Sequence, residues 1–259
     1  MPPMPSAGSM TMPGMGGLSP AVAPWLPSVP NVSTVTPAVP RRMEELRDGD
    51  TLTLVASIVS RTINGRRLLM YAFNGQYPGP LLRAPEGSTI VVPFENRLDQ
   101  PSAVHWHGVR LENRSDGVPG LTQPEVAPGG RFEYRVRFRD AGIYWYHPHV
   151  REDIQQDLGL YGNILVRPPK SDDDVPVDRE EVLALDDILL DETGTVPYGA
   201  TAPTHALMGR WGNVFHVTGE PRWKASVSRG DVVRFYLTNV SSARVYNLAF
   251  AGARLKVVA

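Results

Sequence analysis

The stretch FEYRVRFR at residues 132–139 decides the fold class, because apolar and charged side chains alternate along it without exception. This period of two places one face of a β-strand on a hydrophobic core and the other face in water. Similar short runs, rich in β-branched and aromatic residues and separated by turn sequences, lie at 51–58, 67–73, 89–94, 103–107, 143–146 and 160–166. Strands of this length and spacing predict an all-β protein folded as an antiparallel β-sandwich.

A second copy of the pattern follows in the C-terminal part of the chain. GSTIVVPFEN at 87–96 and GDVVRFYLTN at 230–239 each begin with Gly and end with Asn, and both ends are offset by 143 positions. We interpret this as an internal repeat of a whole domain. With the same offset, the last residue, Ala259, corresponds to Asp116 of the first copy. The second copy is therefore expected to be partial and the chain to be a fragment of a longer protein, since a sandwich cut there would leave unpaired strand edges.

Composition divides the chain into four segments. Residues 1–45 are rich in Met, Pro, Gly and Ser and are predicted to form a disordered arm. The first folded domain then covers 46–168, a polar and proline-broken linker covers 169–178, and the partial second domain covers 179–259. Five of the eight methionines lie in the first fifteen residues. Their thioethers would suit Cu(I), although a tail that binds nothing is the simpler interpretation.

Charge and cysteine content exclude several classes of function. Lys and Arg number 26 and Asp and Glu number 27, so the net charge of −1 predicts no nucleic-acid or anionic-membrane partner. Cysteine is absent, which excludes disulfide frameworks, thiol nucleophiles and iron–sulfur sites formed by this chain. No stretch approaches the roughly 18 apolar residues of a membrane span. No secretory signal is visible in this chain either.

Four of the six histidines form two His-x-His pairs at the ends of predicted strands. His105 and His107 lie in AVHWHG, and His147 and His149 lie in YWYHPHV. Residues two apart on a strand share a face, so each pair presents two imidazoles side by side. Neutral imidazole is a ligand for Cu, Zn, Fe and Ni. A single pair could equally be structural, but two pairs predict one shared site for more than one metal ion.

The second copy of the repeat carries no such pair. The positions equivalent to the first His-x-His pair hold Leu248 and Phe250, which we expect to pack in a core. The metal requirement is therefore predicted to be confined to the first copy. The other two histidines, His205 and His216, each stand alone. They are predicted to lie at the surface or to be hydrogen-bonded.

Several motifs closely resemble the N-terminal cupredoxin domain of the multicopper oxidases, the laccase-like family. The resemblance covers about residues 65–168, and a weaker one to the copper-free second domain of the family covers about 180–259. The motifs are FNGQYPGPLLRAPEG (73–87), HWHG (105–108), DGVPGLTQ (116–123), YWYHPHV (144–150) and DLGLYGNILVRPP (157–169). The resemblance implies a cupredoxin-like β-sandwich of Greek-key topology, with one complete domain followed by a partial one.

The resemblance also implies copper as the cofactor. It makes His105 a ligand of the type-2 copper and His107, His147 and His149 ligands of the type-3 pair, in a trinuclear cluster that reduces O₂ to water. Asp116 matches the acidic residue that transfers protons in the family, although an Asp-Gly turn explains it equally well. The type-1 copper needs a Cys ligand. That site and the remaining cluster ligands are expected in a C-terminal part missing from this chain, which alone should be inactive.

Two functions therefore stay open. The first is a copper-dependent oxidoreductase that couples one-electron oxidation of a phenolic, aromatic or metal-ion substrate to the four-electron reduction of O₂ to water. The alternative is a non-catalytic copper-binding cupredoxin protein that serves copper sequestration or resistance. A copper nitrite reductase would need a type-1 cysteine in the first domain, and none is present. The expected partners are O₂ and a small-molecule or metal-ion reductant, and the family resemblance implies a periplasmic or extracellular location.

Overall fold

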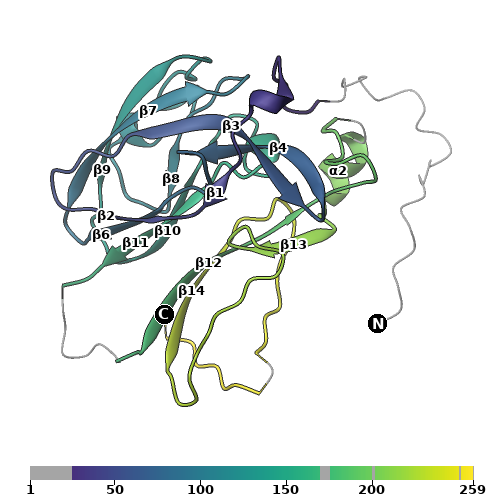
Figure 1. The fold of residues 1–259 in the computed structure, drawn as a ribbon. Coiled ribbons are helices and arrows are strands. Elements are labelled where there is room, and N and C mark those ends of the chain that lie inside the picture. Colours follow the sequence, from purple (N-terminus) through teal and green to yellow (C-terminus); the bar gives the residue numbers. More distant parts are fainter. Residues whose placement is uncertain (1–24, 170–175, 200–201, 251, 259) are drawn as a thin grey trace.

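The computed structural model describes residues 25–169, 176–199, 202–250 and 252–258, and most of them form β-strands and their connections (Figure 1). Two sheets form a sandwich in the first part of the chain, and a three-stranded sheet forms in the second part. The predicted all-β fold is confirmed. The helices are short: η1 (Val32–Thr34), η2 (Asn113–Ser115), α1 (Glu152–Gln155) and α2 (Ala202–Met208). Within the described residues, no helix combines the length and the apolar character that a membrane crossing requires.

The first sheet of the sandwich has six strands in the order β1-β5-β4-β3-β7-β9. β3 and β4 form its central hairpin. The two residues of the connecting turn, Asn64 and Gly65, both have positive φ, as a type I′ turn requires. The parallel pairing of β3 with β7 makes the sheet mixed rather than purely antiparallel. The strands are β1 (Val39–Pro40), β3 (Leu54–Ile63), β4 (Arg66–Phe73), β5 (Gln76–Tyr77), β7 (Thr89–Arg97) and β9 (Arg131–Arg137).

The second sheet carries the two His-x-His segments. Its order is β2-β6-β11-β10-β8, so β8 lies at the edge beside β10. β10 pairs antiparallel with both neighbours, whereas β6 pairs parallel with β11 and β2. The strands are β2 (Met43–Glu45), β6 (Leu81–Pro85), β8 (His105–His107), β10 (Gly142–His147) and β11 (Gly162–Arg167).

The alternating stretch that predicted the fold behaves as expected. Tyr134, Val136 and Phe138 are fully buried, whereas the arginines between them are exposed. Their side chains join one hydrophobic core with residues of both sheets, including Trp106 and Tyr146. Burial of each large apolar side chain contributes roughly 1.5–3 kcal/mol to folding. The aromatic core is therefore what holds the two sheets together.

The folded part begins closer to the N-terminus than we predicted. Residues 1–24 of the expected arm lie outside the described residues, but residues 25–45 contain β1, β2 and η1. Trp25 forms backbone hydrogen bonds in both directions with Tyr198, and β2 adds a parallel strand to β6. These contacts are made with residues distant in sequence, which explains why local composition did not reveal them.

The internal repeat appears as a repeated pairing of strands. The small sheet consists of β12 (Arg179–Ile188), β13 (Val214–Val217) and β14 (Val233–Asn239). β14 runs parallel to β12, as β7 runs parallel to β3. Asn96 and Asn239 also end their strands alike, because the side-chain oxygen of each accepts a hydrogen bond from the backbone N–H two residues later. The offset of 143 residues thus relates equivalent structural positions.

Leu248 and Phe250 do not pack as we expected. They are 43% and 38% exposed, and the ring of Phe250 rests on that of Phe235 with 5.0 Å between centres. The expectation rested on equivalence to β8, which is covered by a second sheet. Among the described residues, the three-stranded sheet provides no comparable facing layer over these positions.

The small sheet packs on the outer face of the second sheet of the sandwich. Leu81 and Leu165 form one apolar cluster with Val182 of β12, and Tyr161 forms another with Ala184. β11 is therefore covered on both faces, which explains its continuous burial. The His-x-His strands β8 and β10 belong to this same sheet.

A buried polar network accompanies the apolar clusters. The hydroxyl of Tyr161 donates a hydrogen bond to Asp186 at 2.8 Å, and Arg210 lies 3.3 Å from Asp157. Burial raises the pKa of Asp157 to about 6 and that of Asp186 well above its ordinary value. Ionised carboxylates in such surroundings are costly unless they are fully paired.

His216 was expected to be hydrogen-bonded or exposed, and it is neither. Only 2% of the residue is accessible, and no hydrogen-bond partner among the described residues reaches either ring nitrogen. Its Nε2 lies 3.8 Å from Asp186 Oδ2, which is too far for a hydrogen bond. Burial, reinforced by the charge of Arg61, lowers the pKa of His216 to about 3.

Replacement of His216 by leucine should stabilise the protein, most of all in acid. Leu removes a buried unsatisfied group, which is worth about 1–3 kcal/mol. In the wild type the folded-state pKa of about 3 lies below the unfolded value near 6.5, so stability falls as pH drops from 6.5 toward 3. Urea unfolding at pH 7.5 and pH 5 should show a gain that is larger at pH 5. A variant that is less stable at both pH values would contradict this explanation.

Candidate metal centre

The register between β8 and β10 positions the predicted ligands. His105 stands directly opposite His147, and Trp106 stands opposite Tyr146. Because side chains alternate along a strand, the two aromatic residues point into the core and the two histidines lie on the other face. Trp106 and Tyr146 are fully buried, and their rings pack 5.8 Å apart. The core thus fixes where the imidazoles stand.

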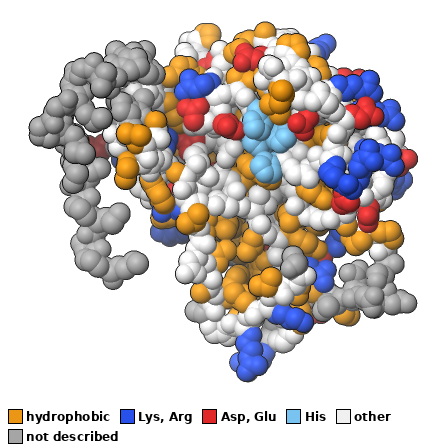
Figure 2. Space-filling view, turned by 180° about the vertical axis from the view of Figure 1, so that it is seen from behind, with side chains coloured by type: hydrophobic (Ala, Val, Ile, Leu, Met, Phe, Trp, Pro, Cys, Tyr) orange, Lys and Arg blue, Asp and Glu red, His pale blue; other side chains and the backbone are white. Residues whose placement is uncertain are grey.

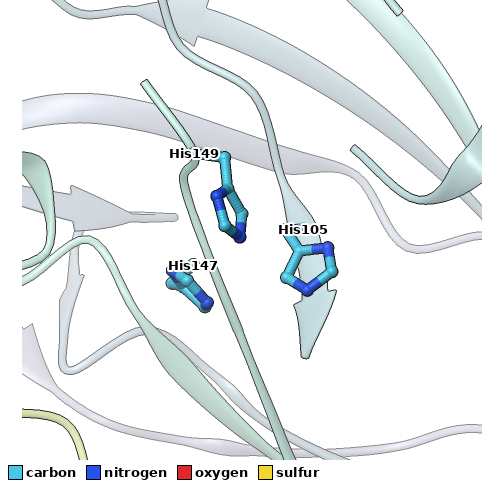
Figure 3. A group of neighbouring side chains, drawn as sticks. All are labelled: His105, His147 and His149. Atoms are coloured by element: carbon cyan, nitrogen blue, oxygen red, sulfur yellow. The ribbon is translucent and has the colours of Figure 1, made fainter. Parts of the chain in front are cut away.

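All four predicted histidines come together. The ring centre of His105 lies 5.5 Å from that of His147 and 4.6 Å from that of His149. The ring of His107 lies 5.7 Å from His105 and 5.4 Å from His147. One nitrogen from each of His105, His147 and His149 falls within a group whose members are all within 4.8 Å of one another (Figure 3). Figure 2 shows histidine side chains as a single patch at the surface, and the buried His147, which is 3% exposed, contributes little to it.

Backbone carbonyls select the ring nitrogens that remain free. Nδ1 of His105 donates a hydrogen bond to the Asp116 carbonyl at 2.7 Å, and Nδ1 of His147 donates to the Pro148 carbonyl at 2.9 Å. A carbonyl only accepts, so the proton of each neutral ring resides on Nδ1 and the lone pair on Nε2. His107 is turned the other way, with its Nδ1 3.2 Å from Nε2 of His147.

The site keeps its imidazoles neutral. Burial and, to a smaller extent, repulsion by the neighbouring rings of His149, His105 and His107 together lower the pKa of His147 to about 3. Burial is also the main cause of the lowered pKa values of His105 and His107. A proton on one ring would be poorly solvated and would repel the others. The cluster therefore presents lone pairs rather than positive charge at neutral pH.

This donor set fits copper. Several neutral imidazoles with converging lone pairs are suitable ligands for a borderline transition metal. Trp145 stacks on His147 with ring centres 4.0 Å apart and thereby restrains its plane. His107 lies against the same indole at 4.9 Å. The rings are thus held in position by the protein itself, as a site for closely spaced metal ions requires.

Comparison with known proteins identifies the family. Residues 57–171 match the family model described as "Multicopper oxidase". Copper resistance protein A of Pseudomonas syringae pv. tomato is 41% identical over 125 residues, which cover 48% of this chain and 20% of that protein. Multicopper oxidase MmcO of Mycobacterium tuberculosis is 39% identical over 137 residues, covering 53% and 26% respectively.

Solved structures agree. The crystal structure of a multi-copper oxidase from Pseudomonas thermotolerans is 32% identical and has a TM-score of 0.68, covering 79% of this chain and 47% of that one. Lac15 from a marine microbial metagenome is 40% identical with a TM-score of 0.61, covering 75% and 48%. Residues 57–171 belong to the multicopper oxidase family. The sandwich is cupredoxin-like, as predicted, and the chain spans about a fifth to a quarter of the curated relatives named above.

Asp116 lies beside the cluster of this multicopper oxidase domain and also forms a turn. Asp116 follows the last residue of η2, and its backbone N–H donates a hydrogen bond to the carbonyl of Asn113, the first residue of that helix. Its carboxylate oxygen Oδ1 lies 3.5 Å from Nδ1 of His105, and a third of the side chain is exposed to solvent. Both interpretations of the Asp-Gly motif therefore remain compatible with its position.

Glu152 is a residue that our sequence analysis missed. It begins the short helix α1, and its Oε2 lies 3.6 Å from Nδ1 of His149. A carboxylate there favours a proton on Nδ1 and so leaves Nε2 of His149 for a metal. In the sequence, the spacing of three residues between His149 and Glu152 is the feature that could have indicated this contact. The contact itself could not be predicted, because it depends on Arg151, whose φ of 41° turns the chain into α1 and brings Glu152 to His149.

Gly117 places the Asp116 carbonyl close to His105. It has a φ of +78°, and a Cβ there would lie 1.8 Å from the carbonyl oxygen of Val104. Gly120 in the same loop has a φ of +75° and open space around its Cβ position.

Replacement of Gly117 by alanine should therefore weaken copper binding, because it forces the loop away from β8 and breaks the hydrogen bond to His105. Loss of such a supporting contact costs about tenfold to a hundredfold in metal affinity. Calorimetric titration with Cu(II) should show this loss. The control Gly120→Ala introduces the same backbone strain as Gly117→Ala but no clash, so it should bind copper nearly as well as the wild type. Equal losses in both variants would contradict the role given to Gly117.

Proposed function

We propose that this chain contributes the N-terminal half of the trinuclear copper site of an oxidase. The whole enzyme would couple one-electron oxidation of a phenolic, aromatic or metal-ion substrate to the four-electron reduction of O₂ to water. The observation that carries the proposal is the convergence of two His-x-His pairs from β8 and the end of β10 on one surface patch. The family of residues 57–171 supports copper as the metal.

The ligand assignment follows the family resemblance. His105 would hold the type-2 copper, and His107, His147 and His149 would hold the type-3 pair. The facing of His107 Nδ1 and His147 Nε2 at 3.2 Å supports their sharing one type-3 ion. Bound copper would supply the electron transfer to O₂. The protein contributes neutral, oriented imidazoles and a strand pair that fixes their spacing.

Proton supply is the second task of the site, since four protons are consumed for each O₂ reduced to water. Asp116 would act here as the catalytic carboxylate. It stands beside His105 and retains enough exposure to exchange protons with solvent. The fixed carbonyl of the same residue holds His105 while the carboxylate stays free to move a proton.

The remaining parts of the enzyme would come from polypeptide outside these 259 residues. The chain has six histidines and no cysteine, so it cannot form the His₂Cys type-1 site that receives electrons from the substrate. Substrate contacts would lie near that site, and this chain alone would be inactive. In keeping with the family resemblance we place the enzyme in the periplasm or outside the cell.

Copper binding without catalysis is the competing function. Two of the relatives are named Copper resistance protein A, from Pseudomonas syringae pv. tomato and Escherichia coli. The group of His105, His147 and His149 could retain a copper ion without an electron donor. Oxygen consumption separates the two functions, because a sequestering protein binds copper and reduces no O₂.

Simultaneous replacement of His105 and His107 by alanine, in the complete enzyme, should abolish O₂ uptake and leave the blue type-1 absorption intact. Two cluster ligands are lost, whereas the electron entry site lies elsewhere. Oxygen electrode traces and visible spectra would be recorded together, with His205→Ala as a control outside the cluster. Undiminished O₂ uptake would refute the assignment, and copper binding without any O₂ uptake in the wild type would favour sequestration.

A further inference from the structure

A row of arginines lies on the outer face of β9 and its extension. Arg135, Arg137 and Arg139 occupy every second position, opposite in direction to the buried Tyr134 and Val136. All three arginines are exposed. Over the described part of the chain, no carboxylate comes within 4.0 Å of any of the three guanidinium groups. Figure 2 shows Lys and Arg side chains gathered near one edge of the face that also exposes the histidines.

These arginines line a cavity. It has a volume of about 130 Å³, and its other walls are Thr89 of β7 and residues 110–112, which follow the His-x-His strand β8. Ser115 fastens this loop to β9, because its hydroxyl accepts a hydrogen bond from the backbone N–H of Arg135. The cavity thus lies between β9 and a loop that is hydrogen-bonded to it.

The acidic side chain that lines the cavity, Glu112, and the nearby Asp140 are both paired with other arginines. Arg110 makes two hydrogen bonds to Asp140, at 2.8 and 2.9 Å. Glu112 accepts a hydrogen bond from Arg114 at 3.0 Å. Neither carboxylate forms an ion pair with the three β9 arginines, and the nearby Asp48 accepts a hydrogen bond from the backbone N–H of Thr89 instead. An anion bound in the cavity would compensate the positive charge of these arginines.

We propose that this cavity binds a tetrahedral oxyanion, either inorganic phosphate or sulfate or the phosphorylated end of a larger molecule. The planar guanidinium fork donates pairs of hydrogen bonds to phosphate-type oxygens, which a spherical chloride ion cannot match. The volume suits one such group rather than a whole organic ligand. The bound anion would relieve the repulsion within the arginine row and hold residues 110–112 against β9.

The proposal does not depend on the copper site, and its test does not use oxidase activity. Binding of inorganic phosphate and of phenyl phosphate to the full chain would be measured by isothermal titration calorimetry in chloride buffer. Wild type would be compared with Arg137→Gln, which removes the central guanidinium. The matched control is Arg131→Gln, which removes an arginine from the same strand outside the cavity, where it pairs with Glu95 at 3.2 Å.

We expect saturable binding that Arg137→Gln weakens about tenfold or more and that Arg131→Gln changes by less than about twofold. Equal affinity for the two probes would identify a site for the free ion, and tighter binding of phenyl phosphate would identify a site for a phosphorylated molecule. The proposal is overturned if neither probe binds saturably up to about 10 mM. It is also overturned if both variants lose affinity equally, because the loss would then follow from the net charge of β9 and not from the cavity.

Discussion

The pairing of β8 with β10 in one register is the constraint on which the metal centre depends. With His105 opposite His147, the intervening aromatic pair, Trp106 and Tyr146, must enter the core. A slip by one residue would exchange the faces, leaving two large rings in water and imidazoles in an apolar interior. The burial of Trp106 and Tyr146 makes that slip costly. The hydrophobic core on one face of these strands therefore sets the positions of the imidazoles on the other face.

Hydrogen bonds and burial orient the imidazoles that the strand register places side by side. The carbonyls of Asp116 and Pro148 direct protons to Nδ1 of two rings, and partial burial keeps those rings neutral. The close approach at Gly117 makes the first of these contacts possible. Each feature acts before any metal binds, so the energetic cost of ordering the ligands is met by folding. Preorganisation of this kind is what distinguishes a metal site from a chance cluster of histidines.

The features that the sequence could predict are those with local periodicity. Alternation at 132–139 predicted a strand, and the His-x-His spacing predicted that the histidines lie close together, although His149 lies just beyond the end of β10. Features that depend on distant partners were missed or mistaken. The order of residues 25–45 rests on contacts such as that of Trp25 with Tyr198, and the burial of His216 rests on the packing of the small sheet against the sandwich. Glu152 gains its meaning only from the helix that brings it to His149.

X-ray absorption spectroscopy of the copper-loaded chain tests the central claim most directly, since it reports the atoms bound to the metal. The account predicts a first shell of nitrogen at about 2.0 Å with the outer-shell scattering of imidazole rings. Replacement of His147 by alanine should deplete this shell. A first shell of sulfur, which would place copper on methionines such as those of residues 1–15, or a shell of oxygen alone, would contradict the account.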